Sequence, residues 1–364
     1  MSYIVLSCIV LVLSYGYGWV KQNKSEEKTL QRLLLGIIIV ALCLFAGLRT
    51  RYNDTYAYLQ GFQNMPDDFS ALFGEEFSFS EVYLFSAWGY FIHHYISANV
   101  NVYFFLSSII FVVPSVLLIE KYSKNFLLSM LMYMFAGMYL FSLAGLKQSM
   151  ATGIILMGLP ALFKKQYIRY YLCCIIALGF HMYSIFFLLL PLLGRDKIFN
   201  KATILTCAII FILGVGMSFF SSIISSLIEF LGKDVDEETL ESGSVNILRA
   251  LVYIVPLLLT VFSSKRLDAE TSTEEKIFLK TAILSSMFMV LALFGNPILF
   301  GRIPQYFYVG LITMLPLILQ KSFVKNEWTM IQILAGILYG IFGFYSLYKD
   351  GAFSIDIFRL TWFW

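Results

Sequence analysis

Apolar runs recur along the whole chain, separated by short polar segments. Most of these runs approach or reach the roughly 20 residues that an α-helix needs to cross a bilayer. Two of them, 167–180 and 182–193, are too short to cross alone, so we expect tilted helices or a break around a water-filled cavity. The pattern predicts an all-α, polytopic transmembrane helical bundle, a single integral membrane domain over residues 1–364, with about twelve spans: 2–20, 31–48, 101–119, 126–143, 147–162, 167–180, 182–193, 203–228, 246–263, 277–294, 303–320 and 328–347.

Residues 81–97 form a further apolar segment that does not fit this count. A crossing here would invert every later loop and oppose the distribution of basic residues. We therefore expect an interfacial or re-entrant helix on the outer side, within an outer loop over residues 49–100. A thirteenth crossing is the alternative.

Basic residues set the expected orientation, because cytoplasmic loops carry an excess of Lys and Arg. The run at 2–20 lacks a basic segment before it and a small-residue cleavage site after it, so we expect a retained first span and no signal peptide. The segment 229–245 is an acidic outer loop of the opposite character. The predicted cytoplasmic segments, which place both termini outside, are 21–29, 120–125, 163–169, 194–202, 264–276 and 321–327.

Composition excludes a soluble protein. Hydrophobic residues make up 59% of the chain and charged residues only 13%, whereas about a quarter of an ordinary soluble domain is charged. The 35 Phe and 23 Tyr suit lipid-facing packing and interfacial belts. A net charge of +3 is too small to indicate a nucleic-acid partner. Five cysteines lie in apolar runs without metal-ligand spacing, so we expect buried free thiols: Cys8, Cys43, Cys173, Cys174 and Cys207.

Ionizable and amide side chains interrupt or border the apolar runs at four predicted outer turns. An unpaired charge in hydrocarbon costs several kcal/mol, so such residues are functional-site candidates. The alternative is that the arginines anchor to lipid headgroups and that the amide and imidazole pack between helices. Their shared location favours an outward-facing cationic cavity formed by Arg49, Arg51, Asp54, Lys147, Gln148, His181 and Arg302.

These residue types suit the transfer of a group that leaves with a phosphate. Arg and Lys bind phosphate oxygens through charge-assisted hydrogen bonds and stabilise a departing diphosphate. Histidine transfers protons near neutral pH. The sequence shows no Walker A pattern, no HExxH and no tight cluster of outer carboxylates, so we expect neither a metal ion nor another cofactor, and an activated lipid-linked donor would supply the energy.

Short motifs along the chain resemble the EpsG family of Wzy-type polysaccharide polymerases. The resemblance covers about residues 30–320 and implies the joining of oligosaccharide repeat units carried on undecaprenyl diphosphate, at the outer face of the bacterial cytoplasmic membrane. It also implies a GT-C-like, O-antigen-ligase-like architecture, membrane lipids, a flippase and a chain-length regulator as partners, and an extracellular or capsular polysaccharide as product. The motifs are Ala46-Gly-Leu-Arg49, Asn53-Asp54-Thr-Tyr56, Leu146-Lys-Gln-Ser-Met-Ala151, Gly179-Phe-His181-Met-Tyr-Ser184, and Arg302 with Tyr306-Phe307.

The resemblance also suggests roles for the site residues. Arg302 with Arg49 or Arg51 would neutralise the diphosphate, assisted by Lys147 and Gln148. Lys147 departs from the arginine that the family usually shows and lacks its bidentate geometry. Either His181 or Asp54 would accept the proton of the attacking hydroxyl. Two other classes stay open: a transporter or flippase of lipid-linked oligosaccharides, and a membrane sugar O-acyltransferase.

Overall fold

Every regular element in the part of the chain described by the computed structural model is helical. That part comprises all residues except 1, 74–82, 231–242, 350, 353–354 and 356–364. The longer helices are α1 (Tyr3–Asn23), α2 (Lys28–Leu48), α5 (Val100–Tyr122), α8 (Leu146–Phe163), α15 (Thr273–Leu291), α16 (Ile303–Ser322) and α17 (Trp328–Lys349). The shorter ones are α3 (Thr55–Gln63), η1 (Phe69–Phe73), α4 (Tyr83–Tyr95), α6 (Phe126–Phe135), α7 (Met138–Ala144), α9 (Tyr167–Leu178), η2 (Met182–Leu193), α10 (Lys201–Val215), α11 (Met217–Phe230), α13 (Ile247–Phe262), α14 (Ser264–Glu270) and η3 (Lys325–Glu327).

Seven helices of the described chain are long and apolar enough to cross a membrane. They are α1, α2, α5, the continuous pair α6 and α7, α8, α16, and α17 together with η3. Two bent pairs bring the number to nine if each is one span: α10 with α11, bent by 110°, and α13 with α14, bent by 72°. This set of helices is consistent with an integral membrane protein.

The predicted count of twelve spans is therefore not confirmed by length and composition. Three predicted spans do not meet these criteria of length and composition, and each has a physical reason. The helices α9 and η2 have 12 residues each, so at about 1.5 Å per residue α9 reaches only part of the roughly 30 Å hydrocarbon core. The helix α15 is long enough, but it carries Glu274, Glu275, Lys276 and Lys280. The described chain supports seven to nine spans.

The centre of the bundle is α16. In the most apolar stretch of α16, 94% of the residues are buried inside the bundle. In the corresponding stretch of η3 and α17, only 11% are buried. A close crossing with α15 explains this burial, because a Cβ on Gly310 would lie 2.7 Å from Thr281 Cβ and 2.8 Å from the Phe278 carbonyl oxygen. Glycine lets the two backbones approach, as small residues do in membrane helix pairs. The crossing thus packs α16 closely against α15. Arg302 is the N-cap residue of this buried helix.

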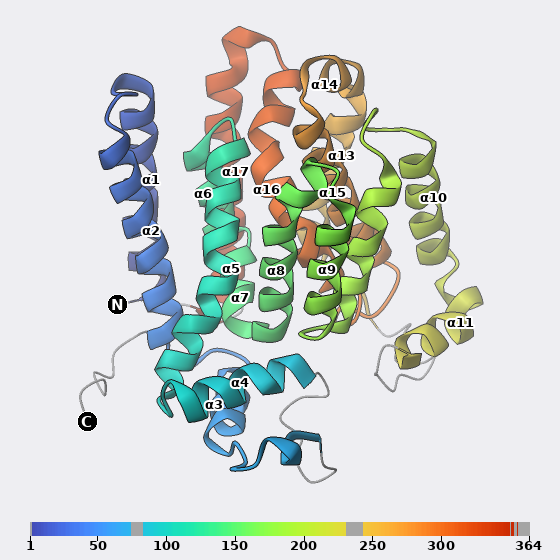
Figure 1. Cartoon of the computed structure of the whole chain (residues 1–364). Coiled ribbons are helices and arrows are strands. Elements are labelled where there is room, and N and C mark those ends of the chain that lie inside the picture. Colours follow the sequence, from blue (N-terminus) through green and yellow to red (C-terminus); the bar gives the residue numbers. More distant parts are fainter. Residues whose placement is uncertain (1, 74–82, 231–242, 350, 353–354, 356–364) are drawn as a thin grey trace.

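The six basic segments predicted to be cytoplasmic gather at one end of the bundle, the upper end in Figure 1. A chain of polar contacts connects them all. It consists of Lys21 with Glu120 (2.7 Å), Lys124 with Glu275 (2.7 Å), Lys321 with Glu270, the Ile198 N–H donating to Asp268 (2.8 Å), and Arg195 donating to the Phe163 carbonyl. A common location at one end is what the orientation rule requires. That this end is cytoplasmic stays a prediction.

The opposite end carries a small layer formed by α3, η1 and α4, which lies across the lower end of the bundle in Figure 1. The Trp88 indole N–H donates to Ser107 on α5 (2.9 Å), and the Leu84 N–H donates to the Gly179 carbonyl beyond α9 (3.0 Å). At 13 residues, α4 is too short to cross a bilayer alone. Most of the predicted acidic loop 229–245 lies outside the described residues.

Candidate functional site

A cavity of about 1050 Å³ opens at this lower end, where several helices begin. Its walls come from the turn before α3, from α7, from the first turns of α8, η2, α13 and α16, and from the end of α17. Five of the predicted site residues line it: Asp54, Lys147, Gln148, His181 and Arg302. Arg49 and Arg51 are not among the lining residues.

Arg49 is a buried structural residue, with 3% of its surface exposed. Its Nε donates to Thr55 Oγ1 (3.2 Å), its Nη1 donates to the Ala46 carbonyl (2.5 Å), and its guanidinium lies 4.0 Å from the ring centroid of Phe104. These bonds hold the turn before α3 against α2 and α5. The predicted diphosphate role of Arg49 does not follow from this geometry, and we infer instead that Arg49 positions the turn.

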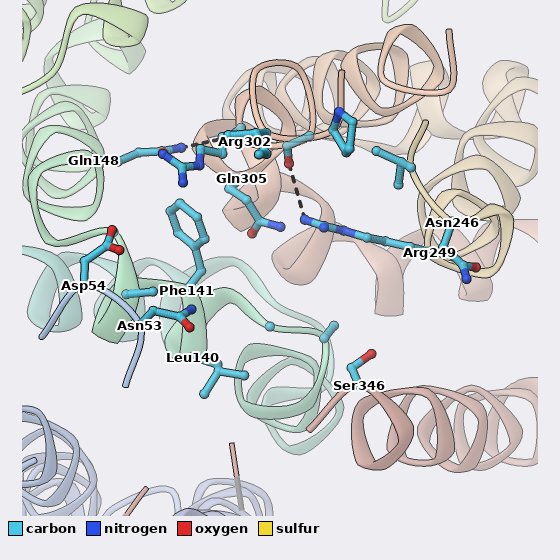
Figure 2. Close-up of a pocket in the computed structure, with 18 of the residues that line it drawn as sticks. Asn53, Asp54, Leu140, Phe141, Gln148, Asn246, Arg249, Arg302, Gln305 and Ser346 are labelled. Carbon is cyan, nitrogen blue, oxygen red and sulfur yellow. Dashed lines mark hydrogen bonds between the residues drawn. The ribbon is translucent and has the colours of Figure 1, made fainter. Parts of the chain in front are cut away.

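The turn itself places Asp54 at the cavity. Asn53 adopts a left-handed conformation (φ 41°), which asparagine tolerates better than most residues. Asp54 then becomes the N-cap residue of α3 but makes no side-chain capping bond. Its exposed carboxylate lies on the cavity wall below Gln148 in the view of Figure 2. Its oxygens are therefore not occupied by capping hydrogen bonds to α3.

Lys147 and Gln148 occupy the first turn of α8. The Gln148 side chain is buried, and its Nε2 donates to the Arg302 carbonyl (2.8 Å), so it links α8 to the start of α16 as well as lining the cavity. The Lys147 ammonium lies 5.5 Å from the ring centroid of Phe85 on α4. Gln148 therefore packs between two helices, and Lys147 lies at the cavity.

Arg302 is exposed in the cavity, whereas the helix that it precedes is buried from Ile303 to Leu319. Two side chains from other helices hold the adjacent backbone (Figure 2): Gln148 bonds the Arg302 carbonyl, and Arg249 Nη2 bonds the Gly301 carbonyl (3.3 Å). The backbone that carries the Arg302 side chain is thus fixed from two sides.

His181 is the N-cap residue of η2, and its Nδ1 accepts the Tyr183 N–H (3.3 Å). The Tyr306 hydroxyl lies 2.5 Å from the same nitrogen. Because Nδ1 accepts a backbone N–H, a neutral His181 carries its proton on Nε2, and Tyr306 is the donor of the second bond. Gly179 allows this turn to approach α4, since a Cβ there would lie 2.2 Å from Leu84 Cδ1.

Positive charge converges on the cavity from three helix N-termini. Lys147, Arg249 and Arg302 lie at the starts of α8, α13 and α16, and none of these helices has an acidic residue in its first turn. A cation at a helix N-terminus opposes the helix dipole by about 0.3–1 kcal/mol. Within the described residues, neither Arg249 nor Arg302 forms an ion pair. The arrangement is unfavourable for an empty cavity and favourable for a bound anion.

Arg249 is the functional candidate that the sequence analysis missed. It falls in the first turn of the predicted span 246–263, three residues after the N-cap residue Asn246. The sequence did contain a signal for Arg249, because a charged residue inside an apolar run is a candidate for a functional site. Gln305 lines the cavity and was also not predicted, since its contact with Tyr253 links distant parts of the chain. Tyr306 is buried behind the lining and contacts His181.

The described residues contain no group of three or more His, Cys, Asp or Glu side chains placed to hold a metal ion. A family model described as the EpsG family matches residues 32–360. No curated protein and no solved structure matches the chain.

Proposed function

Because the chain belongs to the EpsG family, whose members are Wzy-type polymerases, we propose that it joins oligosaccharide repeat units carried on undecaprenyl diphosphate into an extracellular or capsular polysaccharide. The convergence of Lys147, Arg249 and Arg302 on one cavity carries this proposal. A diphosphate is the group that such a cationic cavity accommodates, and it is the group that leaves when a lipid-linked sugar is transferred.

In the proposed step, a hydroxyl oxygen of one lipid-linked unit attacks the anomeric carbon of the sugar on another. The bond between that carbon and the phosphate oxygen breaks, and its electron pair leaves with the lipid diphosphate. Arg302 and Lys147 neutralise the charge that develops on the leaving group. The proton of the hydroxyl passes to a base on the protein. A single displacement of this kind inverts the anomeric centre.

The geometry favours Asp54 as that base. The unprotonated nitrogen of a neutral His181 is Nδ1, which already accepts hydrogen bonds from Tyr183 and Tyr306. Its Nε2 carries the proton and acts as a donor to substrate oxygen. The Asp54 carboxylate lines the cavity without capping α3, so it is the group suited to accept the proton.

The arrangement of charge along the bundle supports an outward-facing site. The six basic segments meet at one end, whereas Asp54 and Arg302 line a cavity at the other end. If the basic end faces the cytoplasm, the cavity opens toward the outer leaflet. A flippase would deliver repeat units to that leaflet, and a chain-length regulator would act on the product there.

Chain extension by the purified protein in proteoliposomes tests the proposal. Lipid-linked repeat units should lengthen into a ladder without an acyl donor or an ion gradient, which separates a polymerase from an acyltransferase and from a transporter. Arg302→Ala should abolish the ladder, and Arg302→Lys should retain part of the activity, because a point charge replaces a bidentate group. The control is Arg266→Ala, since Arg266 donates to the Lys321 carbonyl at the basic end. Wild-type product length in Arg302→Ala would contradict the assigned role.

A further inference from the structure

The cavity contains a second cationic region, separate from the one formed by Lys147, His181 and Arg302. Arg249 and Asn246 enter from α13, and Ser346 and Lys349 enter from α17. In Figure 2, Arg249 and Asn246 lie on the opposite side from Gln148 and Asp54, with Gln305 between them. We propose that Arg249 holds the diphosphate of the second lipid-linked substrate. This inference rests on the proposed function and extends it.

A reaction between two lipid-linked units brings two diphosphates into one cavity. Their charges repel, and repulsion is strong where water is scarce, so each diphosphate needs its own cations. The cavity of about 1050 Å³ reaches the upper limit of about 1,000 Å³ that is usual for a site holding one small ligand. The cavity therefore has room for more than one diphosphate, and its cations lie in two regions that could each receive one.

Arg249 has the capacity to bind a phosphate where it stands. Its contacts with the Gly301 carbonyl and the Tyr253 hydroxyl leave several of the five N–H groups of the guanidinium for a ligand. In the described part of the chain no carboxylate pairs with it. Because Arg249 and Gln148 hold adjacent carbonyls of the same turn, an anion at Arg249 also lies close to the backbone that carries Arg302.

Gln305 supplies an independent indication that a ligand belongs between the two regions. The side chain lines the cavity, only 7% of it is exposed, and its Nε2 donates to the Tyr253 hydroxyl (3.0 Å). Its Oε1 is buried and makes no hydrogen bond to any described residue. A buried acceptor without a partner costs about 1–3 kcal/mol. A sugar hydroxyl placed between the two diphosphates would satisfy it.

The stoichiometry of prenyl diphosphate binding tests the inference without requiring polymer formation. Native mass spectrometry of the purified protein with farnesyl diphosphate should show two bound molecules in the wild type. Arg249→Gln should weaken the second binding step at least tenfold, because glutamine keeps a polar amide but carries no charge. Arg249→Lys should restore most of the affinity, and Arg266→Ala should bind two molecules. A single bound molecule in the wild type, or two in Arg249→Gln with unchanged affinity, would overturn the proposal.

A competing ligand distinguishes a substrate diphosphate from an ordinary headgroup phosphate. Phosphatidylglycerol added at equal concentration should leave both farnesyl diphosphates bound. Displacement of the Arg249-dependent molecule at equal affinity would instead assign the region to bilayer phospholipid. Chain extension by a protein that binds only one farnesyl diphosphate would refute this inference alone, whereas two sites without chain extension would refute the polymerase proposal alone.

Discussion

Individual cations in the cavity occupy positions where they weaken the helices that carry them. Arg302 precedes α16, and Lys147 lies in the first turn of α8, both at the positive end of a helix dipole. Neighbouring residues provide no acidic compensation in those first turns. We therefore expect these residues to serve ligand binding more than stability, so substitutions there should change activity more than folding.

The two candidate bases should respond differently to substitution. Asp54→Asn should lower the initial rate of chain extension by about 10²–10⁴-fold, the usual contribution of a general base. His181→Gln should lower the rate only about tenfold, because the glutamine amide still donates a hydrogen bond where Nε2–H does. The measurement is the initial rate in proteoliposomes at fixed substrate. A larger loss in His181→Gln than in Asp54→Asn would make His181 the base.

Lys147 provides a test of charge against geometry. Lys147→Arg should retain or increase activity, since a guanidinium keeps the charge and adds a bidentate donor for phosphate oxygens. Lys147→Glu should be inactive because a carboxylate repels the diphosphate, and the neutral Lys147→Gln should lie between them. Chain extension is compared at equal protein levels in the membrane. Equal activity of the Glu and Lys proteins would show that position 147 is structural.

Local patterns in the sequence predicted five residues that line the cavity but not how they are held. Asp54, Lys147 and Arg302 are recognisable because each is polar at the edge of an apolar run. The packing of Arg49 depends on Phe104 from another helix, and the second hydrogen bond of His181 Nδ1 comes from Tyr306, far along the chain. Contacts between distant segments leave no local signal, so these roles required the structure.

Single helices of the bundle are anchored by polar bonds at their ends, and η2 is the clearest case. The buried Lys280 on α15 donates to the carbonyls of Leu193 (2.6 Å) and Gly194 (2.9 Å), where η2 ends. A cation at this end complements the helix dipole and donates to terminal carbonyls, which have no partner within the helix. Since His181 begins the same helix, Lys280 fixes the element that presents His181 to the cavity.

Loss of Lys280 should therefore destabilise the protein. Lys280→Met keeps most of the side-chain volume but removes the donor to the Gly194 carbonyl, while the Leu193 carbonyl keeps only the Asn200 amide as donor. A buried carbonyl left without a donor costs about 1–3 kcal/mol. Thermal unfolding in detergent should show a lower midpoint than in the wild type. The exposed Lys265→Met serves as control and should unfold like the wild type. An unchanged midpoint in Lys280→Met would show that water or a neighbouring donor replaces the ammonium.

The whole molecule separates a basic end from a cavity end. Sequence patterns predicted this polarity, because charge bias and apolar runs are local properties of the chain. They did not predict the number of crossings, since the breaks within 203–228 and 246–263 and the central position of α16 depend on packing between helices. The helical class and the gathering of the basic segments at one end are thus accessible from the sequence, whereas the packing that determines which helices are long and continuous enough to cross a membrane is not.

Catalysis by the whole protein should survive removal of divalent cations. In the proposed step Arg302 and Lys147 neutralise the diphosphate, which is the task that a metal ion performs in many other phosphate-dependent enzymes. Purified protein assayed in EDTA should retain its rate of chain extension. Loss of activity that Mg²⁺ or Mn²⁺ restores would contradict metal independence and would direct attention to the acidic residues of the outer loops.

Labelling of intact cells should reveal which end of the bundle faces outward. In a background without the five native cysteines, Ala98→Cys between α4 and α5 should react with a membrane-impermeant maleimide, because it lies with the cavity end. Lys164→Cys, close to the Phe163 carbonyl that Arg195 contacts at the basic end, should react only after the cells are opened. The two positions lie at opposite ends of the same bundle, so each is a control for the other. Protection of Ala98→Cys together with labelling of Lys164→Cys would mean that residues 81–97 cross the membrane or that the bundle is inverted. Lys24→Cys, in the basic segment that precedes residues 81–97, separates these outcomes: it is protected with the first, because only later loops invert, and labelled with the second.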